Sequence, residues 1–228
     1  MSASGGAVLG IDTASPVVGA ALWLGDRPGP EWSLRAGRGA DEALLPALAE
    51  LIEGWQIQRI AVSTGPGAFT GLRVGVAVAL GLAMSLDLEI SCVDSLAARA
   101  ALVEGPRVLA VLDARKGRVY AGLFSSLGGE VLALGSALDA ELSAVLPQAP
   151  FQAVGEGALV FARQIEAAGG AVVPVPERNP AMQVARLGAA SRAMDPATVQ
   201  LQYLRAADAI VPAGLGQRHG APSRREHE

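Results

Sequence analysis

The sequence contains very few of the residues that most catalytic sites require. Its 228 residues include one cysteine (Cys92), two histidines (His219 and His227) and one lysine (Lys116). One cysteine cannot form an internal disulfide, which suits a reducing compartment, so we expect a cytoplasmic protein. Both histidines fall in a C-terminal stretch without hydrophobic periodicity. The folded part is therefore not expected to hold a histidine-based triad or zinc site.

Positive charge is also scarce, and long hydrophobic runs are few. The formal net charge is −4 and no basic stripe is present, which argues against direct, tight binding of nucleic acid. Residues 1–6 lack the basic cluster of a signal peptide. The longest charge-free apolar run, residues 74–86, would span about 20 Å as a helix, short of a bilayer core of about 30 Å. We expect a soluble protein that does not contact a membrane.

Strand and helix signals occur in two successive passes of similar order. The first pass predicts strands at 7–11, 17–24 and 31–35, a helix at 41–55, a strand at 60–63, a helix at 70–85, a strand at 90–93 and a helix capped by Ser95. Pro46 implies that the first of these helices starts late or kinks. The second pass predicts strands at 108–112, 119–125 and 130–134, helices at 139–146, 157–168 and 182–194, and short strands at 152–155 and 171–175.

Three strands followed by alternating helices and strands, occurring twice, predict a duplicated α/β unit with mixed sheets. The turn at Glu104-Gly105-Pro106 is the expected boundary. The predicted organisation is a first lobe at 1–106, a second lobe of similar topology at 107–211 and a flexible tail at 212–228.

A glycine-rich segment, Gly65-Pro66-Gly67-Ala68-Phe69-Thr70-Gly71-Leu72-Arg73, leads out of a predicted strand into a helix. A helix N-terminus after glycines can hold an anion. However, a P-loop requires Gly-Lys-Ser/Thr at its end, and here Leu72 follows Gly71. A dinucleotide fingerprint requires glycine where Thr70 stands. The spacing does not favour phosphate binding by this loop.

The helix after this loop is apolar on every side, with Gly71, Gly75, Ala79 and Ala83 forming a small-residue ridge. A helix of this kind needs cover on both sides, and small residues at four-residue spacing allow close approach of another helix. The cover is either the second lobe of the same chain or a partner chain. We expect the partner chain.

Two aspartates occupy equivalent places in the two passes. Asp12 and Asp113 each end the first strand of a lobe and begin a hairpin. A two-lobed fold would let them face one another across a cleft that holds a metal–phosphate group. The simpler interpretation is that both are turn residues. Cys92, on or beside a strand, fits an inert core thiol better than a nucleophile.

Several spaced motifs resemble the TsaB (YeaZ) family. They are the Gly65–Arg73 segment, the opening Gly10-Ile11-Asp12-Thr13-Ala14, the Asp113-Ala114-Arg115 hairpin with Tyr120, and Tyr203-Leu204-Arg205. The resemblance extends to about Arg205. It implies a two-lobed, duplicated, ribonuclease-H-like fold of the actin and sugar-kinase (ASKHA) superfamily.

The resemblance also implies a function. The chain would be a non-catalytic dimerisation and activating subunit in the threonylcarbamoylation of the tRNA adenosine next to the anticodon. It would form a homodimer alone, and in the working complex a heterodimer with the catalytic relative TsaD, joined by the ATPase TsaE, with tRNA bound only indirectly. Where TsaD would carry paired histidines, residues 40–44 read Ala-Asp-Glu-Ala-Leu. No catalytic residue, metal ligand or cofactor of its own is expected, and ATP or ADP would bind only in the complex.

The implied interface lies on the glycine-rich loop and the apolar helix. Its expected residues are Gly67, Phe69, Thr70, Gly71, Leu72, Arg73, Val74, Gly75, Val78, Ala79 and Leu82.

The alternative function is an actin-like ATPase or small-molecule kinase, whose nucleotide would contact Asp12, Thr13, Ser15, Asp113 and Lys116. Lys116 itself is explained either by biased base composition or by a functional role. A glycoprotease-type peptidase lacks both ligands and nucleophile.

Overall fold

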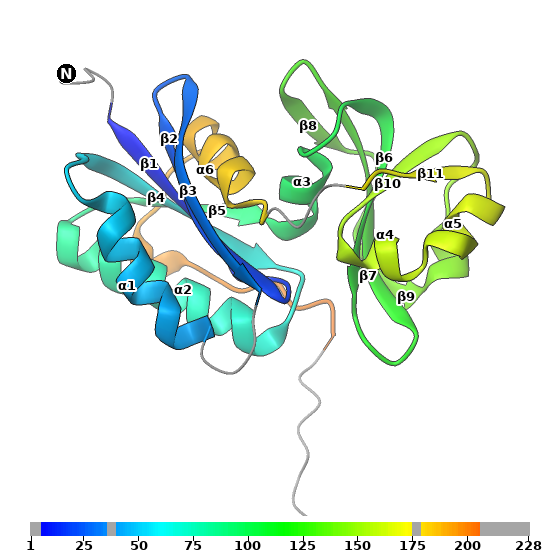
Figure 1. Cartoon of the computed structure of the whole chain (residues 1–228), viewed down its shortest axis with the longest axis horizontal. Coiled ribbons are helices and arrows are strands. Elements are labelled where there is room, and N and C mark those ends of the chain that lie inside the picture. The colour runs from blue at the N-terminus through cyan, green and yellow to red at the C-terminus, as the bar shows by residue number, and fades with distance from the viewer. Residues whose placement is uncertain (1–5, 36–39, 175–178, 206–228) are drawn as a thin grey trace, which may run out of the picture.

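The computed structural model describes residues 6–35, 40–174 and 179–205, which form two sheets lying side by side (Figure 1). The first sheet contains β1 (Ala7–Asp12), β2 (Val17–Leu24), β3 (Arg27–Arg35), β4 (Ile57–Gly65) and β5 (Ile90–Asp94), in the order β3-β2-β1-β4-β5. β1, β2 and β3 form an antiparallel meander, and β4 and β5 run parallel to β1. The tail at 212–228 and both histidines lie outside the described residues.

The second sheet repeats this arrangement. It contains β6 (Gly105–Asp113), β7 (Arg118–Leu127), β8 (Glu130–Ala133), β10 (Phe151–Val154) and β11 (Gly170–Val172), in the order β11-β10-β6-β7-β8, and β9 (Leu138–Glu141) also pairs with β7. β6 to β8 are antiparallel, whereas β10 and β11 run parallel to β6. Strand order and direction therefore match those of the first sheet, and the predicted duplicated α/β fold is confirmed.

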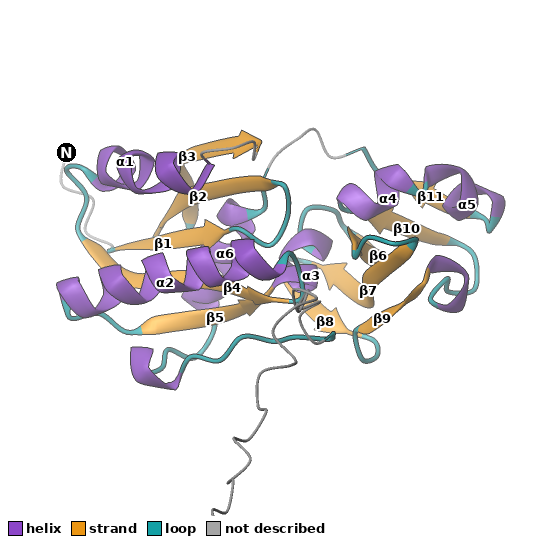
Figure 2. Ribbon diagram, turned by 90° about the horizontal axis from the view of Figure 1, so that it is seen from below, coloured by secondary structure: helices purple, strands orange, loops and turns teal. Residues whose placement is uncertain are grey.

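Helices cover the sheets on the sides where the strands present apolar residues. α1 (Ala40–Ile52) and α2 (Phe69–Leu86) pack on one face of the first sheet, where Leu48 and Ala79 belong to the same core cluster as Leu9 and Ile60. Figure 2 shows α2 lying along β1 and β4. In the second lobe, α4 (Glu156–Val160) and α5 (Ala162–Ala167) cover the face that carries Phe151.

Two helices, α6 (Ala181–Ala190) and α3 (Ser95–Ala100), link the two lobes. α6 follows the second sheet in sequence but packs on the first, next to β1 (Figure 1). The fit is close because a Cβ on Gly10 would lie 2.4 Å from the carbonyl oxygen of Ala181. α3 contacts both sheets. The second sheet begins with β6 at Gly105, so Gly105 and Pro106 of the expected boundary turn lie in this strand. α6, expected in the second lobe, packs with the first because its small residues fit that sheet.

Three local predictions are corrected. Residues 139–146, expected as a helix, form β9 and a 3-10 turn at Leu142–Ala144, since they pair with the edge of β7. The cap of α3 is Asp94, whose carboxylate accepts from the amides of Leu96 and Ala97. α1 does not start late: it begins at Ala40 and continues through Pro46, which is exposed, and the alternative of a kink at Pro46 stays a prediction.

α2 is longer than the apolar run suggested. It has 18 residues and is long and apolar enough to cross a membrane by length and composition alone, yet 28% of those residues are buried inside the chain. The length estimate made from the charge-free run 74–86 alone was therefore too small, because the helix, expected at 70–85, extends over Phe69–Leu86 and includes Arg73. Its buried side packs on β4, so α2 belongs to the first lobe.

Candidate functional site

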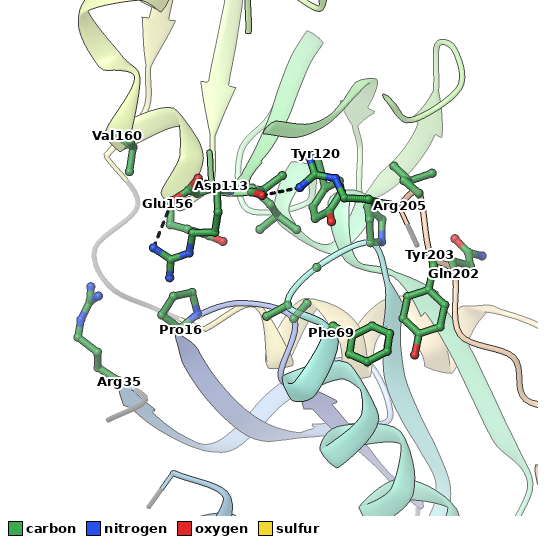
Figure 3. A pocket seen from close by; sticks show the side chains of 18 residues that line it. Pro16, Arg35, Phe69, Asp113, Tyr120, Glu156, Val160, Gln202, Tyr203 and Arg205 are labelled. Carbon is green, nitrogen blue, oxygen red and sulfur yellow. Dashed lines mark hydrogen bonds and ion pairs between the residues drawn. The ribbon is translucent and has the colours of Figure 1, made fainter. Parts of the chain in front are cut away.

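A cavity of about 530 Å³ lies between the two lobes (Figure 3). The glycine-rich loop and the β1–β2 turn line it from the first lobe, and the β6–β7 hairpin and α4 line it from the second. Residues 202–205 complete the wall. Its charged and aromatic lining residues are Arg35, Phe69, Asp113, Arg115, Tyr120, Glu156, Tyr203 and Arg205.

The glycine-rich loop is held against the β1–β2 turn. The hydroxyl of Thr13 donates to the carbonyl of Gly71 at 2.7 Å, and the amide of Ala68 donates to the carbonyl of Ala14 at 2.8 Å. A Cβ on Gly67 or Gly71 would lie 2.4 or 2.2 Å from a backbone oxygen of this turn. The loop glycines are thus explained by close packing of backbone on backbone.

A strap formed by residues 201–205 crosses the loop and joins the two lobes. The amide of Gln202 donates to the carbonyl of Thr64 at 2.8 Å. The rings of Tyr203 and Phe69 lie 5.0 Å apart, and the guanidinium of Arg73 sits 3.7 Å from the Phe69 ring centre. Figure 3 shows Phe69 and Tyr203 at one end of the cavity.

The far end of the strap is anchored to the second lobe by Arg205. Its Nε and one terminal nitrogen donate to both carboxylate oxygens of Asp139, at 2.6 and 2.8 Å. Arg118 donates to the same carboxylate at 2.8 Å. Burial alone would raise the pKa of Asp139, but the hydrogen bonds from Arg205 and Arg118 hold it below the ordinary value.

The five residues expected to contact a nucleotide are not gathered. Asp113 lines the cavity, where its carboxylate accepts from the amide of Arg115 at 2.8 Å. Lys116 is exposed at the hairpin tip and does not line the cavity. Ser15 is buried and its hydroxyl donates to the carbonyl of Val17, while Thr13 holds the loop as described.

Asp12 does not face Asp113 across an open cleft, which contradicts the interpretation of the two aspartates as a metal–phosphate site and leaves the simpler one, that both are turn residues. The side chain of Asp12 is fully buried and pairs with Arg99 at 3.1 Å, and the amide nitrogen of Asn179 donates to the same oxygen at 3.2 Å. Arg99, on α3, is itself 2% exposed and also contacts Glu156 at 3.6 Å. The acid of the first lobe is therefore neutralised inside the protein and is not presented to the cavity.

Glu156 borders the cavity from α4, with about a third of its side chain exposed (32%). Burial raises the pKa of Glu156 above its ordinary value, and the charge of Arg99 offsets this only in part. Burial alone would lower the pKa of Arg99, but Asp12 and then Glu156 hold it above its ordinary value. Among residues 6–35, 40–174 and 179–205, no group of three or more His, Cys, Asp or Glu side chains is placed to hold a metal ion.

Cys92 lies on β5, half-buried, with its sulfur 3.7 Å from that of Met194. Burial raises the pKa of its thiol, which disfavours the nucleophilic thiolate. This agrees with a core thiol.

The two sides of α2 differ from the expected arrangement. The small-residue ridge faces inward, since Gly75, Ala79 and Ala83 are buried against the sheet together with Leu72 and Val76. A Cβ on Gly75 would lie 2.1 Å from the Thr13 hydroxyl. Leu72, Gly75 and Ala79 are therefore corrected from interface to core.

The opposite side of α2 is open within the described part of the chain. Its exposed residues are Thr70, Arg73, Ala77, Gly81, Met84 and Ser85, and Met84 is 75% exposed. Val74, Val78 and Leu82 flank them, half-buried against the core. Gly67, Phe69 and Gly71 from the expected interface lie at the N-terminal end, where the turn and the strap contact them.

Comparison with known proteins places this two-lobed arrangement in a family. A family model described as TsaD, tRNA N6-adenosine threonylcarbamoyltransferase, matches residues 35–198. Proteins named tRNA threonylcarbamoyladenosine biosynthesis protein TsaB are 35% identical over 130 residues in Bacillus subtilis and 34% identical over 122 residues in Escherichia coli. The chain belongs to the TsaB (YeaZ) group of this TsaD-type family.

The alignments with these two TsaB proteins cover 54% and 50% of the chain and 56% and 52% of the relatives, so the chain spans about half the length of the curated relatives it matches. YeaZ from Pseudomonas aeruginosa aligns at a TM-score of 0.73 and 25% identity, and the alignment covers 87% of this chain and 100% of that protein. A P. aeruginosa protein described as similar to peptidase YEAZ aligns at a TM-score of 0.77 and 24% identity, and the alignment covers 88% of this chain and 100% of that protein. The predicted two-lobed, duplicated α/β fold is confirmed by this likeness.

Several residues that shape the cleft of this TsaB-type chain escaped the sequence reasoning. Arg99, Asp139, Glu156 and Asn179 each act through a partner that lies far away in sequence. A signal was present for Arg99, because it is the one charge in the alanine-rich run Leu96 to Leu102. An arginine in such a run is seldom buried without a carboxylate partner.

Proposed function

We propose that the chain is a non-catalytic subunit in the biosynthesis of threonylcarbamoyladenosine in tRNA, and that it acts by pairing with the catalytic subunit TsaD. The observation that carries this proposal is the outward side of α2, where Ala77, Gly81 and Met84 are exposed beside the half-buried Val74 and Val78. An apolar helix side of this kind favours a protein partner.

The rest of the assembly is part of the same proposal. In the absence of TsaD, α2 pairs with α2 of a second copy. In the working complex TsaE joins the heterodimer, tRNA is bound by the partners, and any ATP or ADP is held jointly with them. The complex acts in the cytoplasm. The names of the relatives and the matched family model support this pathway.

The alternative of an independent ATPase or kinase is not favoured. Its nucleotide would need carboxylates of both lobes to hold a metal ion, and Asp12 is buried against Arg99. Titration calorimetry of the isolated chain with Mg-ATP is expected to show no binding heat. Measurable binding would favour the alternative.

Pairing is tested with charge substitutions on the exposed side of α2. Ala77→Asp and Met84→Asp place a carboxylate at exposed positions of α2, so each variant is expected to melt within a few degrees of the wild type. Each is expected to weaken association with TsaD at least tenfold in calorimetry. Val78→Asp is a less suitable probe, because Val78 also packs against the core.

Leu159→Asp is the matched control. Leu159 is 51% exposed on α4 of the second lobe, away from α2. The control is expected to bind TsaD as the wild type does and to support tRNA modification by TsaD and TsaE. Unchanged binding of both α2 variants would contradict the proposal, and so would full modification activity in the absence of the chain.

A further inference from the structure

The cluster of Asp12, Arg99 and the partly exposed Glu156 joins three separate elements at the base of the cleft. Asp12 ends β1 of the first sheet, Glu156 begins α4 of the second lobe, and Arg99 comes from α3 between the two sheets. Both carboxylates contact one guanidinium, Asp12 at 3.1 Å and Glu156 at 3.6 Å. A single side chain therefore supplies the positive charge shared by an acid from each lobe.

These two acids resemble a cation site in their placement. Two carboxylates brought together from opposite lobes at a cleft are oxygen ligands of the kind that a divalent ion binds. However, a cation entering here would meet the charge of Arg99 at contact distance, and Asp12 has no exposed surface through which to reach it. The residues present do not fit a bound metal ion.

The position of the Arg99 guanidinium is fixed by hydrogen bonds in addition to its ion pairs with Asp12 and Glu156. Its NH1 nitrogen donates to the carbonyl of Ser95 at 2.8 Å, within α3. Asn179 donates to the backbone carbonyl and to the carboxylate of Asp12, both at 3.2 Å. The pairing is thus held from both sides and does not depend on a flexible surface side chain.

We propose that Arg99 is the built-in cation of the interlobe cleft: it bridges the acids of the two lobes in the position that a divalent metal ion would otherwise take, and so makes the cleft independent of metal. Arg99 acts here as a positioning residue, since it orients Asp12 and Glu156 and does not itself line the cavity. This inference does not depend on pairing with TsaD.

Removal of Arg99 should convert the cluster into a metal site. Two carboxylates then remain without a countercharge, and each must either take up a proton or recruit a cation. We expect Arg99→Ala to bind one Mn²⁺ per chain, detected by electron paramagnetic resonance, at least tenfold more tightly than the wild type. Mn²⁺ should also raise its melting temperature, whereas the wild type should not respond.

Matched variants test whether the gained Mn²⁺ binding occurs at this cluster. Arg99→Lys keeps a positive charge and is expected to behave as the wild type does. Arg99→Ala combined with Glu156→Gln removes one ligand and is expected to lose the gain in Mn²⁺ affinity. If the gain survives Glu156→Gln, the ion binds elsewhere and the proposal is overturned.

A separate control tests whether Arg99→Ala folds. If Arg99→Ala is unfolded in EDTA but folds with Mn²⁺, the proposal is supported directly. If it is unfolded in both conditions, Arg99→Gln decides, because its amide retains a hydrogen-bond donor beside Asp12 without the charge. A folded Arg99→Gln or Arg99→Ala that binds Mn²⁺ no better than the wild type overturns the proposal.

Discussion

The rings of Phe69 and Tyr203 lie 5.0 Å apart at an interplanar angle of 37°, joining the first turn of α2 to the strap near the end of the described chain. Arg73 completes the cluster, since its Nε donates to the Tyr203 hydroxyl at 3.3 Å. Two residues further on, Arg205 is bound to Asp139 of the second lobe. The stack therefore contributes to holding the strap across the cleft.

Tyr203→Ala is expected to lower the free energy of unfolding by about 1 kcal/mol, because the ring contact with Phe69 is lost. Tyr203→Phe keeps the ring and loses only one exposed hydrogen bond, so a change below about 0.5 kcal/mol is expected. Urea unfolding measures both. Equal losses in the two variants would show that the hydroxyl, and not the ring contact, holds the strap.

The two sides of α2 should respond oppositely to an added methyl group. Gly75→Ala places a Cβ 2.1 Å from the Thr13 hydroxyl, so we expect a loss of about 1–3 kcal/mol in the free energy of unfolding. Gly81→Ala meets nothing within 4 Å, and alanine is favoured in helices by about 1 kcal/mol, so a gain is expected. Thermal unfolding of dilute protein compares them. A stabilised Gly75→Ala would contradict the inward assignment of the small-residue ridge.

Asp139 should make stability depend on pH in the acid range. Its pKa is lowered in the folded chain, so its contribution is present above the unfolded value of about 3.9 and is lost as pH falls through the folded value. Asp139→Asn is expected to be less stable than the wild type at pH 7 by about 1–3 kcal/mol. Urea unfolding from pH 7 to 3 should show this difference narrowing below about pH 4. A difference that stays constant over this range would exclude the carboxylate charge as its cause.

Local pattern was sufficient for most of the fold. The β1–β2 and β6–β7 hairpins followed from β-rich runs ending in turn residues, and their equivalence followed from the repeated order of elements. The region at 139–146 was predicted wrongly because its helical periodicity is weaker than the pairing of Leu138–Glu141 with the edge of β7. Pairing of this kind depends on a strand that lies elsewhere in the sequence.

The candidate site was harder to predict, because its properties depend more on the direction in which each side chain points than on the residue type. The sequence identified the glycine-rich loop, α2 and Asp113 as noteworthy, and these do border the cavity or the exposed helix side. Of its two interpretations of Asp12, the open ligand is contradicted by the burial of this side chain. Asp12 and Arg99 are 87 positions apart, and nothing in either local sequence marks the other as its partner.

The sequence by itself determined the periodicity of each element, the duplication, and the shortage of histidine and cysteine, since these are properties of neighbouring residues and of composition. Only the tertiary structure decided which side of α2 faces the sheet, that α6 returns to the first lobe, and that Arg99 neutralises Asp12. Each of these outcomes depends on close packing or on charge pairing between segments that are distant in sequence. Burial and pairing energies arise only when folding brings such segments together.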